Sequence, residues 1–176
     1  MAKRPCVFCQ GEAETPANPL RALQAFPARL RAAVRGLSPD ALVWRASPRE
    51  WAIKEVVRHL GDVEMVYGTR FRAILAEEDP LLFTLDQDRW AAGLGYVKDN
   101  FADALELFAT IRRWNLLIIK RAGRRSWERA GRHARYGRVT VRQILDHVVH
   151  HDTNHLKQIL GVKSSLPRGG RRRRRA

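Results

Sequence analysis

The feature that most constrains this chain is a long run of apolar residues at helical spacing. They recur at steps of three and four residues, which places them along one face of an α-helix: Ile53, Val56, Val57, Leu60, Val63, Tyr67, Phe71, Ile74 and Leu75. Ser47-Pro48-Arg49-Glu50 precedes the run and has the form of a capping box with proline at the first helical position. The pattern predicts a helix of about 30 residues, from Ser47 to about Glu78, a length typical of helical bundles.

Three other stretches show the same period. The first spans residues 19–36, with Pro27 as a kink or a restart, and another runs from near Asp99 to Ala122-Gly123. The last opens at Thr140-Val141-Arg142-Gln143, a second capping box, and is expected to end near Leu160 with Gly161 as its C-cap. Four long helices predict an all-α fold, a four-helix bundle.

The segments between these helices lack a regular period. A short helical turn is expected around Asp88 to Leu94, and residues 124–139 are expected to form a long loop between helices 3 and 4. No stretch alternates with the period of two that marks a strand. The chain is thus expected to comprise an irregular arm (1–18), the bundle (19–162) and a basic disordered tail (163–176).

Four of the six histidines lie within nine residues of the last predicted helix: His147, His150, His151 and His155. A four-residue step turns about 400°, so His147, His151 and His155 form one ridge, and His150 lies about 100° away from it. Neighbouring members of the ridge can share one metal ion, but His147 and His155 are about 12 Å apart along the axis. His151 therefore belongs to both possible pairs, 147/151 and 151/155.

A third histidine, His59, lies on the apolar stripe of the 53–75 helix, beside Leu60 and Val63. It is expected to point into the bundle core, where it would complete a three-histidine metal site opposite the ridge. A single histidine on an apolar face is also compatible with an ordinary hydrogen-bonded core residue.

Three short motifs together resemble the DinB superfamily: Trp51-Ala-Ile-Lys-Glu-Val-Val-Arg-His59-Leu-Gly-Asp62, Tyr136-Gly-Arg-Val-Thr-Val141, and His151-Asp-Thr-Asn-His155-Leu-Lys-Gln158-Ile159. The resemblance covers about residues 19–162. It implies an up-down-down-up four-helix bundle, often dimeric, with a metal held by His59 from the second helix and by His151 and His155 from the last. Gln158 completes the HxxxHxxQ pattern, and His147 is then a residue behind the ligands, a cleft-lining residue or a core residue.

Three neutral imidazoles leave a divalent ion with an open position, the arrangement of catalytic rather than structural sites. Zn²⁺ or Ni²⁺ is expected first, and Mn²⁺, Fe²⁺ or Co²⁺ is admissible. Such a site can ionise water or a thiol. The resemblance includes bacillithiol S-transferases and a mycothiol-dependent maleylpyruvate isomerase, and so implies a low-molecular-weight-thiol S-transferase in which a metal-bound thiolate attacks a small electrophile. The alternatives are a non-catalytic metal-binding or stress-linked interaction protein and a metal-dependent hydrolase.

Other candidate residues surround this set. Asp62 follows His59 by three positions and could orient a ligand, and Trp51, about two turns before His59, could line the cleft. Cys6 and Cys9 form one CxxC in the arm. With no second CxxC it is a possible second metal half-site completed by another chain, a redox pair or an inert pair.

The net charge of +15 includes six arginines in residues 168–176. Such a charge attracts nucleic acid or anionic lipid without sequence preference, and no specific nucleic-acid motif is present. The longest apolar runs have four residues, far short of the roughly 20 that cross a bilayer. No apolar segment follows residues 1–6, so no secretory signal is expected. We expect a cytoplasmic protein with no membrane partner.

Overall fold

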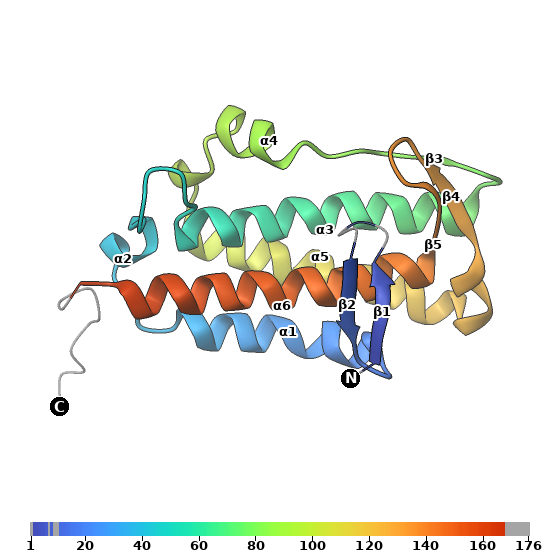
Figure 1. Cartoon of the computed structure of the whole chain (residues 1–176), viewed down its shortest axis with the longest axis horizontal. Helices are drawn as coiled ribbons and strands as arrows, with labels where there is room; N and C mark the ends of the chain where they lie inside the picture. Colours follow the sequence, from blue (N-terminus) through green and yellow to red (C-terminus); the bar gives the residue numbers. More distant parts are fainter. Residues whose placement is uncertain (1, 7, 9–10, 168–176) are drawn as a thin grey trace.

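The structure, a computed structural model, describes residues 2–6, 8 and 11–167 (Figure 1). Four long helices form an elongated bundle: α1 (Pro19–Val34), α3 (Ile53–Ala76), α5 (Phe101–Ala122) and α6 (Val141–Ser165). α3 and α5 run in the same direction, whereas α1 and α6 run opposite to them (Figure 1). The predicted all-α four-helix bundle with its up-down-down-up order is confirmed.

The parallel pair requires a long return along the bundle between α3 and α5. This segment contains β3 (Leu81–Leu82), α4 (Gln87–Gly93) and the 3₁₀ turn η1 (Tyr96–Lys98). The short helical turn expected near Asp88 is therefore present as α4. The connection between α5 and α6 is also long, and it holds the 3₁₀ turn η2 (Arg124–Glu128) and two strands. A further short helix, α2 (Pro39–Val43), follows α1, and α1 itself passes through Pro27 as one helix.

Two predicted helix ends were wrong. α3 begins at Ile53 rather than near Ser47, because the Glu55 carboxylate accepts a hydrogen bond from the Ala52 amide (2.8 Å) and so caps the first turn there. α6 continues past Gly161 to Ser165, because Val162 is buried in the core and the Lys163 ammonium donates to the Ala33 carbonyl oxygen (2.6 Å). Tertiary contacts thus outweigh the local stop signal of the glycine.

The expectation of no strands was also wrong. β4 (Ala130–His133) and β5 (Gly137–Thr140) form a hairpin within the segment expected to be a loop, and β3 pairs with β4 in parallel. The arm expected to be irregular contains an antiparallel hairpin of β1 (Ala2–Cys6) and β2 (Gly11–Thr15), which packs on α6 (Figure 1). These strands are only two to five residues long, too short to show a period in sequence. The predicted basic tail falls mostly on residues 168–176, outside the described residues.

A polar layer divides the apolar core at mid-height. One apolar cluster lies toward the β3–β4–β5 end and includes Tyr67, Leu116 and Val148, and the other includes Phe26, Phe108 and Leu156. Between them, α3, α5 and α6 contribute a set of buried or half-buried polar side chains: His59, Asp62, Glu64, Arg112, Asn115, His151, Asp152 and His155. Because burying polar groups is costly unless they are paired or bound, this layer is where function is expected.

Two glycines within α3 give a matched test of helix packing. A Cβ built on Gly68 would lie 2.5 Å from Asn115 Oδ1, whereas one on Gly61 would lie 3.6 Å from Leu107 Cδ2. Gly68→Ala is therefore expected to lower the free energy of unfolding by about 1–3 kcal/mol, because the new Cβ would displace the buried Asn115 side chain from its hydrogen bonds to Glu64. Gly61→Ala is expected to be neutral or to stabilise by up to about 1 kcal/mol. Urea unfolding of both variants would check this, and equal effects would contradict the close α3–α5 contact.

Candidate metal centre

Three histidines from two helices converge within the polar layer. His59 Nε2, from α3, lies 3.1 Å from His151 Nε2, and His151 Nε2 lies 3.1 Å from His155 Nε2, both from α6. One ring nitrogen from each residue lies within 4.8 Å of the others. Of the two histidine pairs that spacing allowed on α6, the pair that faces His59 is 151/155.

Burial favours the uncharged form of all three rings, which is the form that binds metals. Burial, with a smaller contribution from His155, lowers the pKa of His59 to about 3. Burial likewise lowers the pKa of His151 and of His155 below the usual value. The Gln158 side-chain oxygen lies 2.8 Å from His155 Nδ1. Since that oxygen only accepts, the His155 proton resides on Nδ1 and its Nε2 presents a lone pair toward the other two rings.

The donor set fits a divalent ion. Two nitrogens each about 2.1 Å from one ion are about 3.0–3.4 Å apart for angles between octahedral and tetrahedral. The separations of 3.1 Å lie in this range. Nδ1 of His59 and Nδ1 of His151 are buried without a hydrogen bond in the described part of the chain, so a cation at Nε2 would set the tautomer of both rings.

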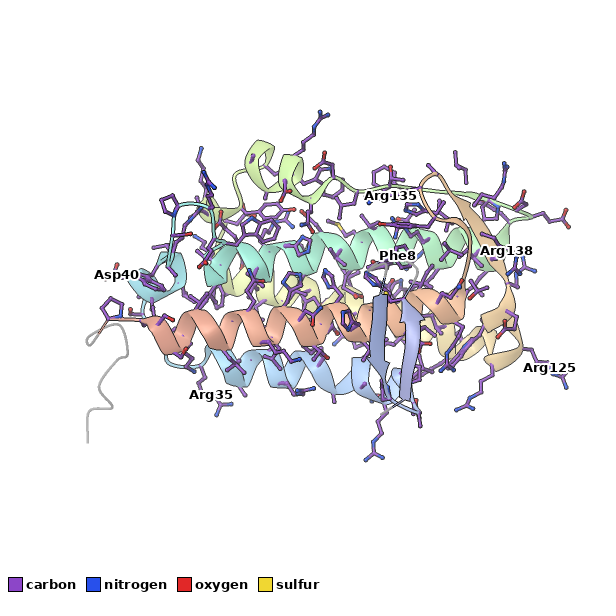
Figure 2. All side chains as sticks on the ribbon, viewed as in Figure 1. Phe8, Arg35, Asp40, Arg125, Arg135 and Arg138 are labelled. Carbon is purple, nitrogen blue, oxygen red and sulfur yellow. The ribbon has the colours of Figure 1, made fainter. Side chains whose placement is uncertain are left out.

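A cavity of about 600 Å³ adjoins the histidines. His59 and His151 form part of its wall, and the cavity extends along α3 toward the β4–β5 hairpin, where Arg135 lies at the tip (Figure 2). His147 lies in the wall between these ends: its ring is 4.5 Å from that of Phe8, and its Nδ1 is 3.2 Å from Cys6 Sγ. His147 thus lines the cleft and lies outside the three-histidine cluster.

The carboxylates of the polar layer form their hydrogen bonds and ion pairs with residues other than the three histidines. Asp62 accepts a hydrogen bond from the Tyr96 hydroxyl (2.5 Å) and pairs with Arg58. The structure thus places Asp62 among side chains of α3 and η1, and its role toward the histidines stays a prediction.

A second set of hydrogen-bonded and ion-paired side chains is centred on Arg112, which is 3% exposed. Its guanidinium pairs with Asp152 (2.7 Å) and with Glu64 (2.8 Å), and Asn115 donates to the other Glu64 oxygen (3.0 Å). Burial raises the pKa of Asp152 to about 6, and the Arg112 charge only partly offsets this. This network joins α3, α5 and α6 directly beside the metal centre.

Three further residues were predicted to belong to a site: Trp51, Cys6 and Cys9. The Trp51 ring lies edge-on to His59, with centroids 5.0 Å apart, so it packs on a candidate ligand rather than on the main cavity wall. Cys6 is buried beside His147, whereas Cys9 lies outside the described residues. The second metal half-site therefore stays a prediction.

Sequence reasoning missed several residues of the cavity wall: Phe8, Tyr67, Arg70, His133, Arg135 and Tyr136. For Arg70 a signal was present. It follows His59 by eleven residues, which is about three helical turns, so a charged side chain falls on the apolar face of α3. Phe8, His133 and Tyr136 come from segments expected to be irregular and could not be placed.

The chain is similar to one protein family and to several individual proteins. Residues 22–159 match the family model of the DinB superfamily. The "Uncharacterized protein YuaE" of Bacillus subtilis is 24% identical over 77% of this chain and 91% of its own length. The "Putative metal-dependent hydrolase YfiT" of the same organism is 31% identical, over 41% of this chain and 40% of its own length.

The solved structure of YfiT matches this fold with a TM-score of 0.79 over 88% of this chain and 93% of that chain, at 21% identity. That protein is described as a "probable metal-dependent hydrolase with an unusual four-helix bundle topology". Within the described residues, no helix is long and apolar enough to cross a membrane.

Proposed function

This chain belongs to the DinB superfamily, and on that premise we propose that it is a divalent-metal-dependent enzyme whose ion is held by His59, His151 and His155. The observation that carries the proposal is the convergence of three uncharged imidazole nitrogens from two helices at the wall of a cavity. An ion on three neutral ligands keeps an open position and its full charge, with which it lowers the pKa of a thiol or water that reaches it.

The finer proposal is a thiol S-transferase, supported by what surrounds the histidines. Among the described residues that line the cavity, the sole carboxylate is Asp86, which caps α4 by accepting from the Arg89 amide. Asp86 is thus engaged at the first turn of α4, with its Oδ2 3.4 Å from Arg89 Nε, and the described lining supplies no other carboxylate as a base. A thiol, with a pKa near 8.5, needs far less assistance to ionise than water. The protein's part is then to orient the thiol and an electrophile in the cavity.

A metal-dependent hydrolase is the second candidate, favoured by the names of the relatives. The two activities are separable with the Zn²⁺- or Ni²⁺-loaded protein. We expect thiol-dependent consumption of 1-chloro-2,4-dinitrobenzene with a panel of glutathione, cysteine, bacillithiol and mycothiol. Hydrolysis of p-nitrophenyl acetate that needs metal but no thiol would instead establish the hydrolase. Loss of both with the His59→Ala/His151→Ala/His155→Ala variant is the control, and neither activity in the loaded protein would contradict an enzyme of either kind.

Gln158 offers a test of the metal centre that keeps all three ligands. Gln158→Leu removes the acceptor of the His155 Nδ1–H and is expected to weaken Zn²⁺ binding by about 10–100-fold, because the ring loses its fixed tautomer and orientation. Asn154→Leu is the matched control, since Asn154 contacts the ring of His150 on the same helix. Competition with a zinc chelator would measure both affinities. Equal affinities would show that Gln158 does not orient a ligand.

A further inference from the structure

Arg70 is a buried arginine for which the described residues supply no carboxylate partner. It is 5% exposed, and its Nε donates to the Phe83 carbonyl oxygen (2.9 Å). The rings of Tyr67 and Phe8 lie 5.0 Å and 5.6 Å from its guanidinium carbon. Burial lowers the pKa of Arg70. Interactions with Tyr67 and Tyr136 raise this pKa and offset the lowering only in part. Arg112, buried to a similar degree, has two carboxylates. An arginine without a counter-charge in a cavity wall indicates a place for an anion.

The neighbour of Arg70 adds a second observation. His133 Nδ1 accepts a hydrogen bond from the Arg135 amide (3.1 Å), so in the neutral ring the proton is on Nε2. Nε2 lies 3.3 Å from Arg70 Nη2, which can only donate. In this tautomer Arg70 Nη2 and His133 Nε2 are two adjacent buried donors, and neither accepts a hydrogen bond from the other. An anionic oxygen placed there would accept from both.

The cavity connects this position to the metal centre. His59 and Arg70 lie on the same face of α3, separated by eleven residues and about 16 Å along the helix axis, and both line the cavity. Arg135 is exposed at the tip of the hairpin (Figure 2). Its amide contacts His133, which lies 3.3 Å from Arg70, so both arginines lie at this end of the cavity. One small, extended molecule can thus contact the histidines with one end and Arg70 with the other.

We propose that Arg70 and His133 Nε2, with Arg135 at the mouth, form a carboxylate-binding subsite that selects substrates carrying an anionic group remote from their reactive atom. The inference rests on the proposed function for the identity of that atom, the sulfur of a thiol. The proposed subsite excludes compact thiols as good substrates. In free cysteine only Cβ and Cα separate the sulfur from the carboxylate, so the carboxylate cannot reach Arg70 while the sulfur is at the histidines. The planar fork of arginine favours a carboxylate held by two parallel hydrogen bonds.

The subsite is tested with S-methylglutathione, which carries the carboxylates but no thiol, by calorimetric titration of the full-length protein. We expect measurable binding that is at least about tenfold weaker in Arg70→Met and weaker again for the diethyl ester, which lacks both negative charges. Arg70→Lys is expected to retain part of the affinity. Arg138→Met is the matched control, because Arg138 lies on the same hairpin and donates to the Glu128 carbonyl oxygen outside the cavity.

Arg135→Met keeps the test decisive should Arg70→Met unfold, because an exposed residue at a hairpin tip does not support the core. We expect it to weaken S-methylglutathione binding severalfold. Equal binding of the ester, unchanged affinity in both arginine variants, or no binding to the wild type would overturn the subsite.

A second readout separates this inference from the proposed function. Binding of 2-mercaptoethanol to the Co²⁺-loaded protein is followed by the absorption band of a sulfur–cobalt bond. If the sulfur–cobalt band forms but S-methylglutathione binding does not depend on Arg70, the subsite is overturned and the thiol chemistry stands. Binding that depends on Arg70 without any band overturns the thiol chemistry and leaves the subsite standing.

Discussion

Replacing His151 with alanine should give a folded protein that no longer retains a divalent ion. His151 Nε2 is the central member of the cluster, 3.1 Å from both of the other ligand nitrogens. Removing a residue that only supports a ligand already costs about 10–100-fold in affinity, so removing the ligand itself is expected to cost at least about a hundredfold. Elemental analysis of the untagged protein should fall from about one ion per chain to none.

His150→Ala is the matched control for this prediction. His150 precedes His151 in α6, but its ring contacts the exposed Asn154 side chain instead of the cluster. The control should therefore keep its ion, and both variants should keep the circular dichroism of the bundle. If His151→Ala retained the ion as well as His150→Ala does, the three histidines would be core residues and the metal-dependent function would be withdrawn.

Replacing Arg112 with methionine should cause a large loss of stability. Methionine is apolar and unbranched, and it leaves Asp152 and Glu64 buried without a counter-charge. Breaking a buried ion pair on one side typically costs about 3–5 kcal/mol. For a chain of this size that corresponds to a fall in Tm of roughly 6–20 °C, measurable by calorimetry. Arg113→Met, the exposed neighbour on α5, should change Tm little.

The same variant should be sensitive to pH. Burial places the pKa of Asp152 at about 6 in the native protein, above its ordinary value of 3.8. Between these values the native state binds more protons than the unfolded state, so charging Asp152 lowers stability as the pH rises. Without Arg112 this pKa rises further, and the loss extends to higher pH. The Tm difference between Arg112→Met and wild type should therefore be larger at about pH 8 than at about pH 5, and a difference independent of pH would contradict the role of charge.

Much of the metal centre could be predicted because a helix converts spacing into direction. The four-residue step placed His151 and His155 on one ridge of α6, and the apolar stripe placed His59 on the inner face of α3. The choice of 151/155 over 147/151 came from the family resemblance, since spacing alone allowed both. The start of α3 was predicted wrongly because Ser47-Pro48-Arg49-Glu50 has a good local start signal, whereas the Glu55–Ala52 contact sets the first turn.

Sequence by itself determined the four helices, their inward faces and the histidine ridge of α6, because these depend on the spacing of residues along one helix. The family resemblance then selected His151 and His155 as the partners of His59. Tertiary structure alone decided the short strands, the partners of the buried charges and the cavity wall. Strands of two to five residues are formed by pairing rather than by propensity. Among the described residues, Arg112 pairs with one carboxylate from α3 and one from α6, and Arg70 with none, and only packing shows which buried arginine is neutralised.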